Sequence, residues 1–132
     1  MKLASSLYSF LSENQYVLPL GILLLTLLML LLTLMPSDFM GKSQVWSYDK
    51  VGHAALFGSW CFTVGLYYQI SKPAAKIWPI FVSGVAFGLI IEVLQYALPL
   101  NRSADPMDFI FDVIGCLVAV LALKKIQQKF GD

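Results

Sequence analysis

The sequence predicts an all-α integral membrane protein with four transmembrane helices in a compact bundle. Hydrophobic residues make up 58% of the 132-residue chain and charged residues only 13%, whereas soluble domains are about half apolar and about a quarter charged. The mean hydropathy is +0.74. Apolar runs near the ~20 residues that cross a bilayer recur along the chain, separated by short polar segments. We therefore expect one membrane domain over residues 1–132 and no soluble module.

The predicted spans divide the chain as follows. Residues 1–15 form a weakly amphipathic stretch that predicts a short helix at the membrane interface. The first span, residues 16–35, carries no charge and is longer than the apolar region of a signal peptide, so we expect it to be retained. The later spans are expected at about residues 49–70, 77–98 and 106–123, with a loop before the second and a tight polar turn before the third.

Basic residues predict the orientation of the bundle. Four spans place both termini on one side of the membrane, together with the turn between the second and third spans. The basic residues on that side are Lys2, Lys72, Lys76, Lys124, Lys125 and Lys129. The other side carries only Lys42, Lys50 and Arg102. Because basic segments stay on the cytoplasmic side, we predict that both termini face the cytoplasm, in a bacterial inner membrane.

Charge and cysteine usage exclude some classes of function. The net charge is +1 and there is no tract rich in Lys or Arg, so nucleic-acid binding is excluded. The spacing of Cys61 and Cys116 matches neither a zinc motif nor a redox motif. Both lie in apolar runs, at similar depths on helices that would run parallel. Contact between them is one alternative, but we expect buried, inert thiols.

Polar residues within or beside the apolar runs fall at the ends that this topology turns outward. The second span begins there, the third ends there and the fourth begins there. The residues gathered in this outer layer are Asp49, Lys50, His53, Glu92, Gln95, Arg102, Asp105, Asp108 and Asp112. Ionisable groups at membrane depth are energetically costly, so we interpret the set as a functional site that opens outward. Glu92 has the fewest structural explanations, since apolar residues flank it on both sides.

The order of these residues resembles the VanZ-like family of small bacterial membrane proteins. The resemblance covers about residues 49–123. It is carried by DKVGHAALFG from Asp49, EVLQ from Glu92, Arg102, and DFIFDVIG from Asp108. One departure is Asp112, where the family more often has Asn. The family is named for a member linked to teicoplanin resistance and is associated with the cell envelope. The resemblance therefore implies an envelope role that affects susceptibility to glycopeptides.

An enzyme is one class of function that the residue types support. His53, Glu92 and Asp108 are the catalytic candidates, with His53 as general base and Glu92 as the carboxylate that orients it. There is no serine-nucleophile motif such as G-x-S-x-G. The predicted substrate is a phospholipid of the outer leaflet or a lipid-linked wall precursor.

Binding residues and a metal are predicted for the same site. The candidates for holding substrate are Lys50, Gln95 and Arg102, since arginine offers a two-pronged donor to phosphate or carboxylate. The second-choice site residues are Asp49, Asp105 and Asp112. Several carboxylates suit Mg²⁺ or Ca²⁺, whereas a single histidine makes zinc a poorer fit.

Binding or transport without covalent chemistry is the alternative class. The same acidic pocket can capture a cation, a proton or an amphiphile, or serve only as a structural network between helices. Asp105 and Asp108 also suit the start of a helix, where carboxylates cap backbone N–H groups and complement the helix dipole. Both classes stay open at this point, as do the oligomeric state and any protein partners.

Overall fold

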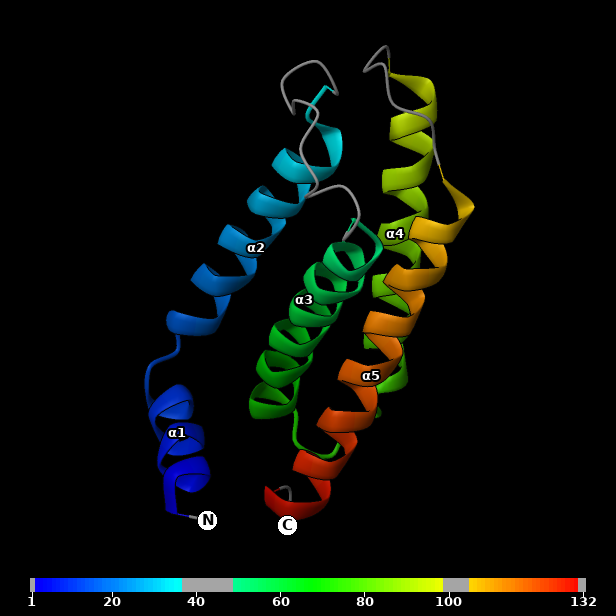
Figure 1. Cartoon of the computed structure of the whole chain (residues 1–132). Helices are drawn as coiled ribbons and strands as arrows, with labels where there is room; N and C mark the ends of the chain where they lie inside the picture. Colours follow the sequence, from blue (N-terminus) through cyan, green and yellow to red (C-terminus); the bar gives the residue numbers. More distant parts are fainter. Residues whose placement is uncertain (1, 37–48, 99–104, 131–132) are drawn as a thin grey trace.

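The computed structural model describes residues 2–36, 49–98 and 105–130, and every regular element among them is an α-helix. The helices are α1 (Lys2–Glu13), α2 (Val17–Leu34), α3 (Asp49–Ser71), α4 (Trp78–Ala97) and α5 (Pro106–Phe130). Helices α2 to α5 run alternately in opposite directions, and α1 lies at the same end of the molecule as the C-terminal end of α5 (Figure 1). The predicted all-α class is therefore confirmed.

Helix bounds follow the predicted spans closely except at the C-terminus. The starts and ends of α2, α3 and α4 fall within one residue of the expected positions. Helix α5 continues to Phe130, beyond residue 123 where the fourth span was predicted to end. Gln127 in this extension donates hydrogen bonds to the carbonyls of Pro73 and Ala75, at 2.7 and 3.0 Å. The extension is thus attached to the turn between α3 and α4.

The membrane character of the chain is carried most clearly by three helices. Helices α2 and α4 and the segment Pro106–Lys129 of α5 are long and apolar enough to cross a membrane. Helix α3 has 23 residues but is not among them, since polar side chains and glycines interrupt its apolar run. A membrane protein is supported, and a fourth crossing by α3 stays a prediction. The placement of α1 at the interface is likewise a prediction, although its helical conformation is confirmed.

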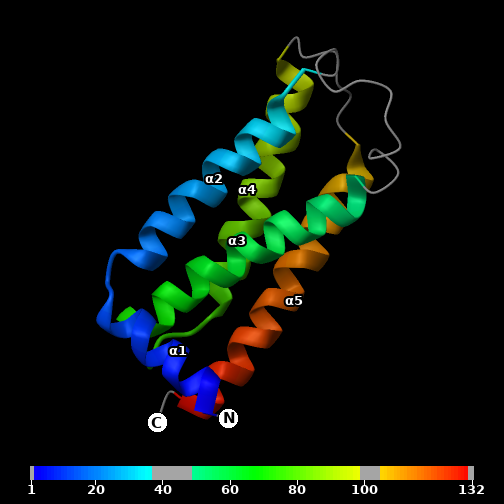
Figure 2. The ribbon, with the colours of Figure 1, turned by 60° about the vertical axis from the view of Figure 1, so that its left-hand side comes forward.

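Helix α3 occupies the centre of the bundle. It packs against α2, α4 and α5, most extensively against α5, and lies between α2 and α5 in both ribbon views (Figures 1 and 2). Two of its polar side chains bond to these neighbours. Trp60 Nε1 donates to Thr26 Oγ1 of α2 at 2.9 Å, and Gln69 Nε2 donates to a backbone carbonyl of α5 at 2.8 Å. Polar groups within membrane bundles face the interior in this way.

Glycines allow α3 and α5 to approach each other closely. A Cβ atom at Gly115 would collide with the backbone carbonyl of Ala54, and one at Gly58 would lie 3.1 Å from the carbonyl oxygen of Gly115. Small residues at contacts between membrane helices permit such backbone approach.

The two thiols meet against another glycine. Cys61 of α3 and Cys116 of α5 are free and buried. Their sulfur atoms both occupy the space that a Cβ atom at Gly84 of α4 would need. The prediction of two buried cysteines at similar depth is confirmed.

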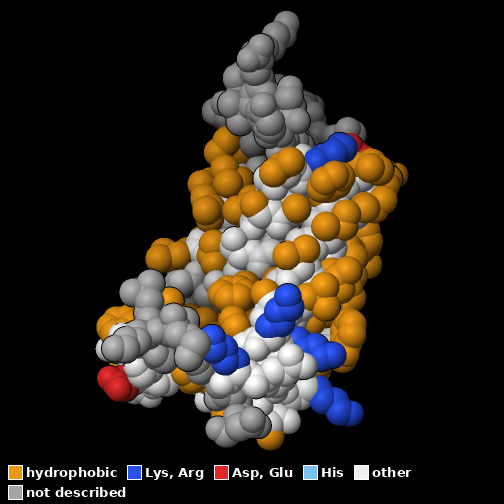
Figure 3. All heavy atoms as spheres, turned by 60° about the horizontal axis from the view of Figure 1, so that its bottom comes forward, with side chains coloured by type: hydrophobic (Ala, Val, Ile, Leu, Met, Phe, Trp, Pro, Cys, Tyr) orange, Lys and Arg blue, Asp and Glu red, His pale blue; other side chains and the backbone are white. Residues whose placement is uncertain are grey.

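The surface of the described residues is divided into an apolar wall and a basic end. Large apolar side chains of α2 face outward, with Leu20, Leu24 and Leu31 more than half exposed. Figure 3 shows basic side chains gathered at the end where α1 and the last turns of α5 lie. An apolar wall of this extent requires lipid or another protein around it.

Candidate functional site

Six polar residues lie together at the end of the bundle where α3 and α5 begin and α4 ends. Helix α3 supplies two of them, α4 one, and α5 with the residue before it three. We call this set the polar cluster: Lys50, His53, Glu92, Asp105, Asp108 and Asp112. Two further candidates cannot be placed in it, because Arg102 and the side chain of Asp49 lie outside the part of the chain that the structure describes.

The start of α5 explains the positions of two aspartates. Asp105 precedes Pro106, and its Oδ1 accepts a hydrogen bond from the backbone N–H of Met107 at 2.9 Å. Proline suits the first position of a helix and aspartate suits its cap. Asp108 lies in the first turn, where the helix dipole favours negative charge. The local sequence therefore both begins the helix and brings two carboxylates to α3.

His53 is oriented by α5. Its Nδ1 lies 2.9 Å from Asp112 Oδ1, and its Nε2 lies 3.8 Å from Asp108 Oδ2, which is too long for a hydrogen bond. Phe57 lies nearly parallel to the imidazole, with 7° between the ring planes. His53 is 3% exposed and Asp112 is fully buried. When the proton is on Nδ1, this N–H donates a hydrogen bond to Asp112. The bond then fixes both the tautomer and the direction of the ring.

This geometry changes the role assigned to one carboxylate. Sequence reasoning gave the orientation of His53 to Glu92, whereas the acceptor at Nδ1 is Asp112, a second-choice residue. The signal that could have found it is depth: His53 and Asp112 each lie about one turn inside helices that run in the same direction. An imidazole held by a carboxylate is the arrangement of a general base.

Lys50 connects the beginnings of α3 and α5. Its Nζ lies 2.9 Å from Asp105 Oδ2 and 3.4 Å from Asp108 Oδ1. The side chains of Lys50 and Asp105 are 41% and 42% exposed, so this pair forms the rim of the polar cluster. The hydrogen bond from Lys50, followed by that from the Met107 backbone, holds the pKa of Asp105 below its ordinary value of 3.8. In the structure the Lys50 ammonium is bound to these carboxylates, and its predicted contact with an anionic group of a ligand stays a prediction.

Glu92 approaches the cluster from α4. It is 8% exposed, and its Oε1 is buried without a hydrogen-bond partner among the described residues. Its titratable neighbours in the polar cluster include Asp108 and His53. A buried carboxylate oxygen without a hydrogen bond is costly. Glu92 is therefore placed to accept a proton or a hydrogen bond from a ligand.

Gln95 has a clear structural partner. Its Nε2 donates to the backbone carbonyl of Thr33 at 2.8 Å, and the side chain is 2% exposed. This bond joins α4 to the last turn of α2. The predicted contact of Gln95 with substrate stays a hypothesis, because this bond neither supports it nor contradicts it.

The acidic groups of the polar cluster outnumber the basic ones. Four carboxylates accompany one lysine and one histidine. Among the residues that the structure describes, no three His, Cys, Asp or Glu side chains are arranged to hold one metal ion. Binding of Mg²⁺ or Ca²⁺ therefore stays a hypothesis.

Comparison with known proteins identifies the family. A family model described as VanZ/LLP1 matches residues 14–127. This range covers α2 to α4 and most of α5, and so extends well beyond the residues that carried the resemblance in the sequence. No curated protein and no solved structure matches the chain. The chain belongs to the VanZ/LLP1 family.

Proposed function

We propose that this VanZ/LLP1-family protein binds or acts on the polar headgroup of a lipid, or of a lipid-linked amphiphile, in the bacterial cell envelope. The observation that carries the proposal is the buried His53 imidazole, oriented by Asp112 and facing Asp108, inside a bundle with apolar walls. Charged and polar groups at this depth are costly, and replacing them by apolar residues would often be neutral or stabilising. Their presence favours a site over a scaffold.

Placement in the membrane follows as part of the proposal. The 23 residues of α3 give a helix about 34 Å long at ~1.5 Å per residue, which is enough to cross a hydrocarbon layer of ~30 Å. With α3 as the fourth crossing, the basic end of the bundle faces the cytoplasm. The polar cluster then opens toward the outer leaflet of the inner membrane. Amphiphiles of that leaflet, including wall precursors, are its proposed ligands, and altered glycopeptide susceptibility is the proposed consequence.

Two members of the cluster suit chemistry on such a headgroup. With Nδ1 bonded to Asp112, the Nε2 side of His53 can take a proton from a hydroxyl group or from water. Glu92 can accept a hydrogen bond or a proton beside it. A reaction of this kind needs no serine nucleophile, since the activated oxygen belongs to water or to the ligand.

Binding of a cation or a proton without covalent chemistry is the second candidate. The observation that favours it is the excess of carboxylates over basic groups in the polar cluster. A binding role predicts a change in surface affinity for drugs without a change in the amounts of envelope lipids. A catalytic or lipid-moving role predicts that a defined molecule accumulates when the protein is absent.

Profiling of envelope lipids and wall precursors tests the proposal. A deletion strain is compared with the same strain carrying wild type, Glu92→Gln or Glu13→Gln at matched protein levels. Glu13 is exposed on α1 and provides the same substitution outside the cluster. We expect a defined molecule to accumulate in the deletion and Glu92→Gln strains, and to clear with wild type and Glu13→Gln. Full clearance by Glu92→Gln would remove Glu92 from the site. Unchanged profiles with altered teicoplanin susceptibility would favour binding alone.

A further inference from the structure

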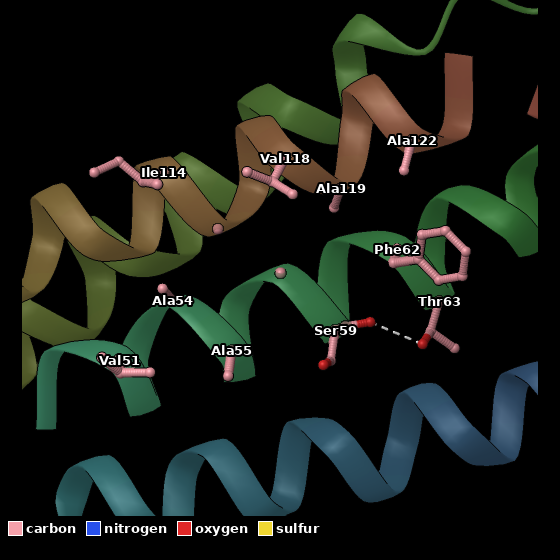
Figure 4. A pocket seen from close by; sticks show the side chains of 12 residues that line it. Val51, Ala54, Ala55, Ser59, Phe62, Thr63, Ile114, Val118, Ala119 and Ala122 are labelled. Carbon is pink, nitrogen blue, oxygen red and sulfur yellow. Dashed lines mark hydrogen bonds between the residues drawn. The ribbon is translucent and has the colours of Figure 1, made fainter. Parts of the chain in front are cut away.

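An apolar groove runs along the bundle wall between α3 and α5 (Figure 4), with a volume of about 630 Å³. Val118 and Ala119 point from α5 toward α3 across it. Among the described residues that line the groove, none is charged, and the only side-chain polar groups are the hydroxyls of Ser59 and Thr63. The Thr63 hydroxyl donates to the Ser59 backbone carbonyl at 2.8 Å. The groove therefore presents an almost wholly apolar surface.

The groove begins beside the polar cluster. Val51 and Ala54, which line it, directly follow Lys50 and His53 of the cluster. From Val51 to Thr63 the groove extends about 18 Å along α3, at ~1.5 Å per residue. Its other end lies near Thr63 of α3 and Ala122 of α5.

We propose that this groove holds one acyl chain of a lipid whose amine-bearing headgroup contacts the polar cluster. The inference rests on the proposed function and names the class of amphiphile. Half of a ~30 Å hydrocarbon layer is ~15 Å, so a groove of this length, starting at the headgroup level, matches one leaflet. An acyl chain from that leaflet fills it, whereas a transmembrane helix of a second copy would extend far beyond it.

The close packing of α3 and α5 gives the groove a floor formed by two backbones in contact. Gly58 and Gly115 bring the two backbones into contact, and this contact forms the floor of the groove. A packing helix measures about 10–12 Å across with its side chains. A single hydrocarbon chain is much narrower and can lie along the floor between the two helices.

Charge complementarity selects the headgroup. The rim pair, Lys50 and Asp105, is about two-fifths exposed, and the described members of the cluster carry more carboxylates than basic groups. Complementary potentials favour a positively charged group on the ligand and disfavour a purely anionic one. A zwitterionic phospholipid with a primary amine meets both requirements, because its chain fits the groove and its amine faces carboxylates.

Native mass spectrometry of the purified protein tests the inference. Phosphatidylethanolamine and phosphatidylglycerol with identical chains are offered to wild type and to four variants. Ala55→Phe and Ala122→Phe fill the groove. Ala86→Phe places the same residue at an exposed position of α4 outside it. Asp105→Asn removes a rim charge and keeps a residue that caps helices well.

We expect wild type and Ala86→Phe to retain one phosphatidylethanolamine per chain. Ala55→Phe and Ala122→Phe should retain about tenfold less, since weak dispersion contacts along the groove sum to the retention of the chain. Asp105→Asn should lower the preference for phosphatidylethanolamine over phosphatidylglycerol. A phosphatidylethanolamine with a photoreactive group on its chain should label the segments 51–63 and 114–122.

The outcomes separate the groove from the polar cluster. If both groove variants retain phosphatidylethanolamine like wild type while Asp105→Asn alters the preference, the groove inference fails and the proposed function stands. If Asp105→Asn leaves the preference unchanged, headgroup binding by the cluster fails, and this inference falls with it. If the groove variants instead lose a dimer present in wild type, a second copy occupies the groove. This result would overturn the proposal that an acyl chain lies there.

Discussion

The bond between His53 and Asp112 allows the most quantitative prediction. Asp112→Ala leaves His53 Nδ1 without its acceptor at 2.9 Å, in a place where the imidazole is 3% exposed. A buried polar group that loses its partner costs about 1–3 kcal/mol, and polar bonds within membrane bundles contribute about 0.6–2 kcal/mol. We therefore expect Asp112→Ala to lower the free energy of unfolding by about 2 kcal/mol.

A double-mutant cycle measures the bond itself. We expect His53→Ala and Asp112→Ala to show a coupling energy of about 1–2 kcal/mol, because the second substitution no longer removes a bond. The assay is reversible unfolding in mixed detergent micelles, monitored by circular dichroism. A cycle of Asp112→Ala with Gln69→Ala is the control. Gln69 bonds to the carbonyl of Leu123 near the other end of α3, so these effects should add within about 0.5 kcal/mol. Additivity in the His53 cycle as well would refute the pairing.

Two further predictions concern the packing of α3 on α5 and the rim of the polar cluster. Gly115→Ala should destabilise the protein by about 1–3 kcal/mol, because its Cβ meets the Ala54 carbonyl, whereas Gly52→Ala, which meets nothing within 4 Å, should be neutral or stabilising in the same unfolding assay. Equal effects of the two substitutions would contradict the close approach. For Asp105 the folded pKa is depressed by Lys50, so its stabilising contribution is complete above the unfolded pKa and is lost as pH falls through the folded value. Asp105→Asn should therefore reduce the loss of unfolding free energy that occurs as pH falls below about pH 4. An unchanged pH dependence would refute the contribution of the Lys50–Asp105 pair.

The extent of the helices could be read from the sequence where hydrophobicity limits them. Apolar runs bounded by proline or polar residues predicted the ends of α2, α3 and α4 to within one residue. The fourth membrane span was predicted to end at 123, where Lys124 and Lys125 follow, whereas helix α5 continues to Phe130. Those lysines mark where an apolar span ends, but a helix continues into water when its next turn is anchored. Gln127, bonded to the Pro73 carbonyl, provides this anchor.

The sequence predicts the level in the bundle at which the polar cluster lies, but not the individual bonds within it. The alternation of helix directions brings the beginnings of α3 and α5 and the end of α4 to one level. Sequence spacing defines the face of each helix, whereas the rotation of one helix against another depends on packing. Gly115 allows α5 to approach the Ala54 backbone closely, and this approach is part of that packing. The partner of His53 therefore became Asp112, and the bond from Gln95 to Thr33 had no signal in the sequence.

The proposed function depends most directly on the polar cluster facing the outside of the cell. Single cysteines at Met107 and at Lys125, in a chain with Cys61 and Cys116 replaced by alanine, test this in intact cells with a membrane-impermeant thiol reagent. Met107 is 45% exposed in the first turn of α5, and Lys125 is exposed in its C-terminal part, beyond the predicted span. We predict that Met107→Cys reacts in intact cells and that Lys125→Cys reacts only after permeabilisation. The reverse pattern would place the cluster at the cytoplasmic face and contradict the proposed action on the outer leaflet.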